Sequence, residues 1–249
     1  MILAVDAGNS DTVFAAFDDN LSIRRRMRVP TASITNESDA GAALAGLGVK
    51  RFGGAIVSSV VPRVTPIIRK AAAIYCAERI VEVSRAINTG ITFEIEHPDR
   101  LGSDRIVNAA YGYHCHGGPL VVVDFGTATT FSAVSADGAF LGGAIMPGLK
   151  TSADALLGGT AQLDAIELNG PVPVVGANTG ECLRIGILEG HAGAVARILA
   201  RIQSRAGNAT VVATGGLSGV MTKRLPEITF LNPDLTIEGL AWLYGMNMG

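Results

Sequence analysis

The alternation of apolar and polar residues divides the chain into two similar halves. Each half begins with three short apolar runs separated by turn residues, which predict strands, and continues with segments whose apolar positions recur every three or four residues, which predict helices. The predicted strands are 2–6, 12–17, 21–29, 54–61 and 80–83, then 120–124, 130–134, 140–146 and 211–214. The predicted helices are 36–47, one after Pro62, one after Ser103, then 148–157, 178–204 and 236–246. This order predicts an α/β fold with a mixed sheet and helices on its faces.

A short motif occurs once in each half, directly after the first predicted strand. The first copy runs from Asp6 to Thr12 and the second from Asp124 to Thr130, and both have Gly two positions and Thr six positions after the Asp. Glycine permits a tight turn and lets a ligand approach the backbone. Backbone N–H groups with Ser and Thr hydroxyls form an anion site, and the Asp suits a metal ion or its bound water. The repeat favours two loops that bind one polyphosphate over two unrelated hairpins that merely need glycine.

A third candidate site lies between Pro98 and the helix that follows it. Pro98 and Gly102 predict a loop, and Ser103 is a candidate N-cap that places Asp104 in the first helical turn. The helix start should lower the pKa of Asp104 and keep its carboxylate ionised. From spacing alone, Asp104 is better explained as a partner of the helix dipole than as a catalytic group.

Composition and charge narrow the classes of function. With 249 residues, 48% of them hydrophobic, the chain can form one large domain or two small ones around a sizeable core. A formal net charge of −2 gives no attraction for nucleic acid, and no apolar stretch approaches the length of a membrane span. The three cysteines are far apart, which fits a reducing compartment. His114 and His116 flank Cys115, but neighbouring residues on a helix cannot all face one metal, so we expect packing there. We therefore expect a cytoplasmic protein that binds neither nucleic acid nor membrane.

The duplicated pattern resembles the superfamily of actin, sugar and acetate kinases and heat-shock chaperone ATPases, in which ATP lies between two such halves. Further strings, in order along nearly the whole chain, resemble type III pantothenate kinases: 58–62, 102–105, 124–131, 142–148, 160–163, 178–179 and 213–216. The resemblance implies a duplicated ribonuclease-H-like, actin-like ATPase fold with mixed five-stranded sheets and a central cleft, divided here into residues 1–116 and 117–249. It also implies ATP-dependent phosphorylation of pantothenate, the first step of coenzyme A biosynthesis, with Mg²⁺, a potassium or ammonium ion and a homodimer.

The resemblance also assigns roles to individual residues. Asp104 becomes the proton acceptor, Asp124 the ligand of the monovalent cation, and Asp6 a ligand of Mg²⁺, directly or through water. Arg105 is a candidate partner for the pantothenate carboxylate. The residues expected to bind ATP are Asp6, Ala7, Gly8, Asn9, Ser10, Asp11, Thr12, Val13 and Thr127, and those expected to bind pantothenate are Gly102, Ser103, Asp104, Arg105 and Thr179.

The chain departs from the family pattern at two positions that bear on substrate and activity. Ile95 stands where the family commonly has a Tyr that helps to bind substrate, and Ser132 stands where Asp is common. Two alternatives therefore stay open: another small-molecule kinase of the same superfamily, and a nucleotide-binding regulatory protein without turnover. Retention of all three candidate aspartates favours an active kinase. The long helix 178–204 is the expected dimer face.

Overall fold

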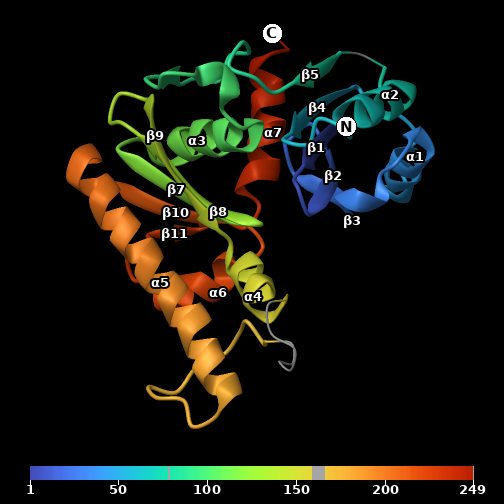
Figure 1. The fold of residues 1–249 in the computed structure, drawn as a ribbon. Helices are drawn as coiled ribbons and strands as arrows, with labels where there is room; N and C mark the ends of the chain where they lie inside the picture. Colours follow the sequence, from blue (N-terminus) through green and yellow to red (C-terminus); the bar gives the residue numbers. More distant parts are fainter. Residues whose placement is uncertain (78, 159–165, 249) are drawn as a thin grey trace. The chain divides into compact units, whose positions relative to one another are not determined.

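The computed structural model describes residues 1–77, 79–158 and 166–248 (Figure 1). Contacts divide the chain into two compact units, one formed by Met1–Cys115 with Asp234–Gly249 and the other by His116–Pro233. Each unit contains a mixed sheet with helices packed on it, so the predicted α/β fold is confirmed. The string 160–163, which carried part of the family resemblance, lies outside the described residues.

The sheet of the first unit has five strands in the order β3-β2-β1-β4-β5. Strand β1 pairs antiparallel with β2 and parallel with β4, so it lies at the centre of the sheet. The hairpin partner β3 and the parallel strand β5 complete the two edges. The bounds are β1 Ile2–Ala7, β2 Asp11–Phe17, β3 Ile23–Pro30, β4 Gly54–Ser59 and β5 Ile80–Glu82, with a further two-residue strand, β6, at Thr92–Phe93.

Two pairs of helices cover the two faces of this sheet (Figure 1). Leu3 and Val5 of β1 pack toward α1 (Glu37–Gly46) and α2 (Thr65–Tyr75). Because side chains alternate along a strand, Ala4 faces the other way, toward α3 (Ser103–His116) and α7 (Leu235–Met246). Asp6 has the same parity as Ala4 and therefore lies on the face that α3 covers. Two 3₁₀ turns, η1 (Thr31–Ser33) and η2 (Pro98–Arg100), link the elements.

The C-terminal helix α7 belongs to the first unit although it follows the second along the chain. Its residues Leu240, Leu243 and Tyr244 share a core with Ala4 and Ile56 of the sheet. The boundary drawn from the sequence grouped this helix with residues 117–249. Local periodicity identifies a helix but does not indicate which sheet it covers.

The five strands that the second unit itself contributes to its sheet repeat the arrangement of the first, in the order β11-β10-β7-β8-β9. Strand β7 takes the place of β1, since it pairs antiparallel with β8 and parallel with β10. Helices α4, α5 and α6 pack against one face, where Val121, Val123 and Phe125 point. The bounds are β7 Leu120–Phe125, β8 Ala128–Val134, β9 Ala139–Pro147, α4 Leu149–Gly158, α5 Thr179–Ala206, β10 Thr210–Thr214, α6 Ser218–Met221, η3 Thr222–Arg224 and β11 Phe230–Leu231.

Side chains at the helix starts explain why two of these helices begin where they do. The sequence offers Asn36 and Ser38 as candidate caps for α1. In the structure Asn36 is the cap, and it forms a capping box with Asp39. Asn178 caps α5 by accepting from the N–H of Glu181 at 3.0 Å. The spacing of Asn178 and Glu181 predicts a capping box, in which Glu181 would accept from the N–H of Asn178. In the structure the Glu181 carboxylate accepts from the N–H of Ala177, one residue earlier.

Candidate active site

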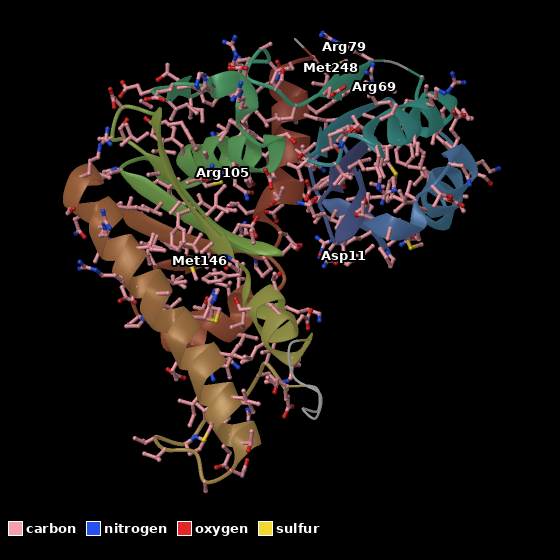
Figure 2. All side chains as sticks on the ribbon, viewed as in Figure 1. Asp11, Arg69, Arg79, Arg105, Met146 and Met248 are labelled. Carbon is pink, nitrogen blue, oxygen red and sulfur yellow. The ribbon has the colours of Figure 1, made fainter. Side chains whose placement is uncertain are left out.

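The turn between β1 and β2 is the first of the two predicted phosphate loops. The pair Ala7–Thr12 closes a four-residue turn, Gly8 to Asp11, and Asp11 lies at its end (Figure 2). Thr31 holds the turn from one side: its N–H donates to Ser10 O at 2.8 Å and its hydroxyl to Gly8 O at 2.7 Å. The C=O and N–H of a trans peptide point in opposite directions, so the N–H of Asn9 points away from Thr31. This arrangement presents a backbone donor to an incoming anion.

The turn between β7 and β8 has the same construction with one residue fewer. The pair Phe125–Thr129 closes it around Gly126, Thr127 and Ala128. The oxygen of Thr127 accepts from the N–H of Gly148 at 3.0 Å and from the hydroxyl of Thr151 at 2.6 Å. Thr127 O is thus held as Ser10 O is held in the first turn. Ser10 and Thr127 each stand two positions before the threonine that closes the turn, Thr12 and Thr129.

The shorter second turn changes which threonines correspond. By sequence alone, Thr12 matched Thr130, because each stands six positions after its Asp. In the structure Thr12 lies opposite Ala7, and the residue opposite Phe125 is Thr129. Thr12 and Thr129 are both fully buried. The threonine correspondence read from the sequence was therefore wrong by one residue.

Each of these two buried threonines makes one side-chain hydrogen bond. The hydroxyls of Thr12 and Thr31 lie 2.9 Å apart, and Thr31 donates onward to Gly8 O, so Thr12 is the donor of this pair. The hydroxyl of Thr129 lies 3.0 Å from Nε2 of His191 on α5. Thr31 and His191 were not predicted as site residues. The only signal for His191 in the sequence is an isolated polar residue on the apolar side of a long helix.

Asp6 connects the first turn to the start of α3 through two serines. Ser58 of β4 is the pairing partner of Asp6, and its hydroxyl donates to Asp6 Oδ1 at 3.1 Å. The same hydroxyl lies 3.0 Å from the hydroxyl of Ser103, the first residue of α3. The residue after Ser103 is Asp104. The chain of bonds therefore brings together two predicted parts of the site, Asp6 and residues 102–105.

The start of α3 differs from the predicted start in one respect. Asp104 lies in the first turn as expected, but Ser103 is already helical, and the N–H of Ile106 donates to Gly102 O at 3.1 Å. Gly102 thus occupies the capping position. The Ser103 hydroxyl is engaged with Ser58 and does not cap the helix.

Burial raises the pKa of Asp104, although the N–H and the positive charge of Arg105 oppose the shift. The expected lowering was wrong because the loss of hydration outweighs the favourable helix start. Burial also lowers the pKa of the Arg105 guanidinium, partly offset by the charge of Asp104. An arginine stays protonated at neutral pH regardless. The site thus combines a carboxylate of increased basicity with a cation on the next residue; Arg105 is labelled in Figure 2.

Asp124 and Thr127 lie in the second unit, as does Thr179, which is the exposed first residue of α5. Gly215 follows β10 with φ +90°, and a Cβ there would collide with Asp124 Oδ1. Only glycine accepts both constraints. Thr214, the pairing partner of Asp124, is buried, and its hydroxyl has no hydrogen-bond partner among the described residues. A carboxylate and an unpaired hydroxyl therefore share one face of the sheet at this point.

Aromatic packing accounts for the two histidines that flank Cys115. His114 stacks on Trp242 with ring centroids 4.5 Å apart, and His116 stacks on Phe230 at the same distance, so packing explains both. Within the described part of the chain, no group of three or more His, Cys, Asp or Glu side chains is arranged to hold a metal. Helices of the described residues are also too short or too polar to cross a membrane.

Solved structures with low sequence identity share the fold. A Baf family transcriptional activator of Campylobacter jejuni matches with a TM-score of 0.60 at 17% identity, covering 98% of each chain. A ROK family glucokinase of Streptomyces griseus, solved with glucose and AMPPNP, matches with a TM-score of 0.55 at 12% identity, covering 97% of this chain and 98% of that one. These likenesses confirm the predicted actin-like, ribonuclease-H-like architecture.

Sequence comparison identifies the family of the chain as well as its fold. Residues 2–201 match the family described as type III pantothenate kinase. Curated type III pantothenate kinases of Moorella thermoacetica and Brevibacillus brevis are each 37% identical over 254 aligned positions. The alignments cover 99% of this chain and 100% and 99% of those proteins. The chain therefore belongs to the type III pantothenate kinase family.

Proposed function

We propose that this chain transfers the γ-phosphoryl group of ATP to the hydroxyl group of pantothenate, the first step of coenzyme A biosynthesis. The match to type III pantothenate kinases over nearly the whole length carries this proposal. In the reaction the hydroxyl oxygen bonds to the γ-phosphorus, the bond from that phosphorus to the ADP oxygen breaks, and the hydroxyl proton passes to a base. The products are phosphopantothenate and ADP.

Asp104 is the proposed base. Phosphoryl transfer has a loose transition state, so orientation of the hydroxyl contributes more than early removal of its proton. The raised pKa of Asp104 makes its carboxylate a better proton acceptor than that of an exposed aspartate. Arg105, the next residue, pairs with the pantothenate carboxylate, and Thr179 is a further proposed contact for this substrate.

The two glycine turns bind the phosphates. The backbone from Asp6 to Val13, including the outward N–H of Asn9, and Thr127 in the second turn supply donors and hydroxyls. These groups are fixed by Thr31 and by Gly148 with Thr151 before any ligand arrives. Donors that are already fixed stabilise the charge that develops in the transition state without having to reorganise. This stabilisation is usually the largest contribution to the rate enhancement in such sites.

The described residues fit the metal ions that the family implies. Mg²⁺ is usually held by one or two carboxylates together with substrate phosphates and water, so Asp6 beside the first turn would suffice. When bound, Mg²⁺ would offset the negative charge of the phosphates. Asp124 and the unpaired hydroxyl of Thr214 are the oxygen donors that would hold potassium or ammonium. Exchange of potassium for sodium should therefore lower the rate, and Asp124→Asn should remove that dependence.

A homodimer is also part of the proposal, with α5 as the contact face. Gly186, Gly190 and Gly193 are exposed along this helix, and nothing lies within 4 Å of a Cβ added at any of them. Spacings of four and three place them on one side, where a second helix can approach closely. Light scattering coupled to size-exclusion chromatography measures the molar mass in solution, which should be that of two chains. We also propose that the protein acts in the cytoplasm, because a reducing compartment keeps cysteines such as its three free ones unpaired.

A coupled assay of ADP release with ATP, Mg²⁺, potassium and pantothenate tests the reaction and the substrate together. Turnover should require pantothenate, and Asp104→Asn should abolish it while ATP still binds. A panel of other small alcohols and sugars serves as the comparison. Turnover with one of these and none with pantothenate would assign the chain to a different kinase reaction. Binding of ATP with no turnover of any acceptor would favour the regulatory alternative.

A further inference from the structure

Three side chains of the first unit form a directed chain of hydrogen bonds. Ser58 donates to Asp6 Oδ1 at 3.1 Å, and the Ser58 and Ser103 hydroxyls lie 3.0 Å apart. A hydroxyl carries one proton, and that of Ser58 is directed to Asp6. Ser103 must therefore donate to Ser58, and the chain runs from Ser103 through Ser58 to Asp6.

The fold explains why these residues meet. Asp6 and Ser58 are partners on adjacent parallel strands, so their side chains lie on the same face of the sheet. Helix α3 covers that face and begins with Ser103. Ser58 is fully buried and Ser103 nearly so. A buried hydroxyl that satisfies two neighbours fixes their separation more firmly than an exposed one, because water cannot replace it.

The second unit shows that this link does not follow automatically from the repeated architecture. Thr214 pairs with Asp124 as Ser58 pairs with Asp6. Its hydroxyl, however, is buried and has no hydrogen-bond partner among the described residues. The Thr214 hydroxyl therefore does not make the link that the Ser58 hydroxyl makes, so this link depends on the side chains of the first unit and not on strand pairing alone.

We propose that Ser58 is a positioning residue for phosphoryl transfer: its hydroxyl ties Asp6, beside the first phosphate turn, to the start of the helix that carries Asp104. The inference rests on the proposed function, since it takes Asp6 as the residue that would hold Mg²⁺ and Asp104 as the base that accepts the proton of the pantothenate hydroxyl. Ser58 is fully buried, so we assign it no direct contact with either substrate. It fixes the distance between the two groups that must act on opposite sides of the transferred phosphoryl group, and errors of about 1 Å in such geometry cost roughly 100-fold in rate.

Four variants test this role, each assayed for kcat, for KM of both substrates and for the Mg²⁺ concentration at half-maximal rate. Ser58→Ala should lower kcat by roughly 10- to 100-fold and raise the Mg²⁺ requirement, since Asp6 loses its orienting donor. Ser58→Thr keeps the hydroxyl and should restore most of the rate; Thr214 shows that the equivalent sheet position accepts threonine. Ser59→Ala is the matched control. Its hydroxyl bonds to Thr65 and Val61, and its removal should leave kcat unchanged.

The fourth variant, Ser103→Ala, breaks the other end of the chain. If the three residues act as a unit, the double variant of Ser58 and Ser103 should be no slower than Ser58→Ala alone. If the fold-decrease in kcat of the double variant equalled the product of the two single decreases, Ser58 and Ser103 would act independently, and the proposed link would be wrong. Unchanged kcat and unchanged Mg²⁺ requirement in Ser58→Ala, at a temperature where circular dichroism shows it folded, would also overturn the proposal.

A calorimetric measurement of Mg–ATP binding separates this proposal from the proposed function. It needs no acceptor, so it remains informative even if the wild-type chain does not phosphorylate pantothenate. Ser58→Ala should weaken Mg–ATP binding and Ser59→Ala should not. Equal affinity in both variants would remove Ser58 from its role, whereas a failure of wild-type turnover with pantothenate would count against the reaction alone.

Discussion

At Gly102 the lack of a side chain decides where the Asp104 carboxylate can lie. A Cβ at this position would stand 2.6 Å from Asp104 Oδ1, closer than atoms of that kind approach. The same oxygen accepts from the N–H of Arg105 at 2.7 Å, so it cannot move aside without losing a hydrogen bond. The glycine that marks a loop in the sequence thus also sets the orientation of the proposed base.

We predict that Gly102→Ala lowers kcat/KM for pantothenate by roughly 10- to 100-fold, because it turns the carboxylate away from the acceptor. Gly41→Ala is a suitable control, since Gly41 lies within α1 with nothing within 4 Å of an added Cβ. That control should leave kinetics unchanged and stabilise the fold by about 0.5–1 kcal/mol. Kinetics of Gly102→Ala that match the wild type would show that the Asp104 geometry does not matter.

The raised pKa of Asp104 has a consequence for the pH profile. A base must be ionised to accept a proton, so activity falls as the pH drops through this pKa. We predict that the acid limb of log kcat/KM for pantothenate lies above the value of about 3.9 that is ordinary for aspartate. Stopped assays across the acid range measure it, with nucleotide binding followed in parallel. An acid limb at the ordinary value would mean that Asp104 is solvated in the working enzyme.

At the scale of elements, α5 anchors the second glycine turn through His191, which is buried next to Thr129 and the ring of Phe125. Burial lowers the pKa of His191, so the folded protein keeps it neutral. An unfolded histidine takes up a proton below about pH 6.5. Stability should therefore be complete above that pH and decline as the pH falls toward the lowered pKa of the folded state.

Urea unfolding of the wild type and of His191→Gln at about pH 8 and about pH 5.5 tests this dependence. The wild type should lose more stability on acidification than the variant does. His116, whose pKa burial also lowers, is present in both proteins, so the difference between them isolates His191. Identical losses in the two proteins would contradict the prediction.

Elements defined by local chemistry were predicted well from the sequence, and elements defined by distant partners were not. The apolar run at β1 and the Asn36 cap of α1 depend on neighbouring residues only, and both were found. The two-residue strand β11 was not predicted, because it exists only by pairing with β10. The pKa of Asp104 was predicted in the wrong direction for the same reason: the helix start is visible in the sequence, but burial by the rest of the fold is not.

For the whole molecule, the duplicated pattern predicted two similar halves, and residue spacing located the two glycine turns that we propose to bind phosphate. The sequence could not show that Ser58 joins Asp6 to Ser103, since these residues are far apart along the chain and meet only through sheet pairing and helix packing. Thr31 was likewise missed. It follows the end of β3 and reaches the first turn only because β3 pairs with β2.

If one nucleotide contacts both turns, Mg–ATP should slow amide hydrogen exchange at residues 6–13 and at residues 124–130 together. Ligand binding to the folded state raises the free energy of opening wherever the ligand makes contact. Exchange followed by mass spectrometry, with ADP alone as the comparison, measures this. Protection of only one turn would mean that the two halves do not share a single polyphosphate.

The second turn is one residue shorter than the first, so the two hairpins cannot replace each other. A chimeric chain that carried Gly8 to Asp11 in place of the three residues after Phe125 would gain one position ahead of β8. The strand would then have to bulge or slide, and sliding by one place turns every side chain to the opposite surface. Phe131 would turn away from the core that it shares with Val121 and Val123, and Thr130 would turn toward that core in place of its neighbours. Each hairpin therefore fits only its own half of the chain.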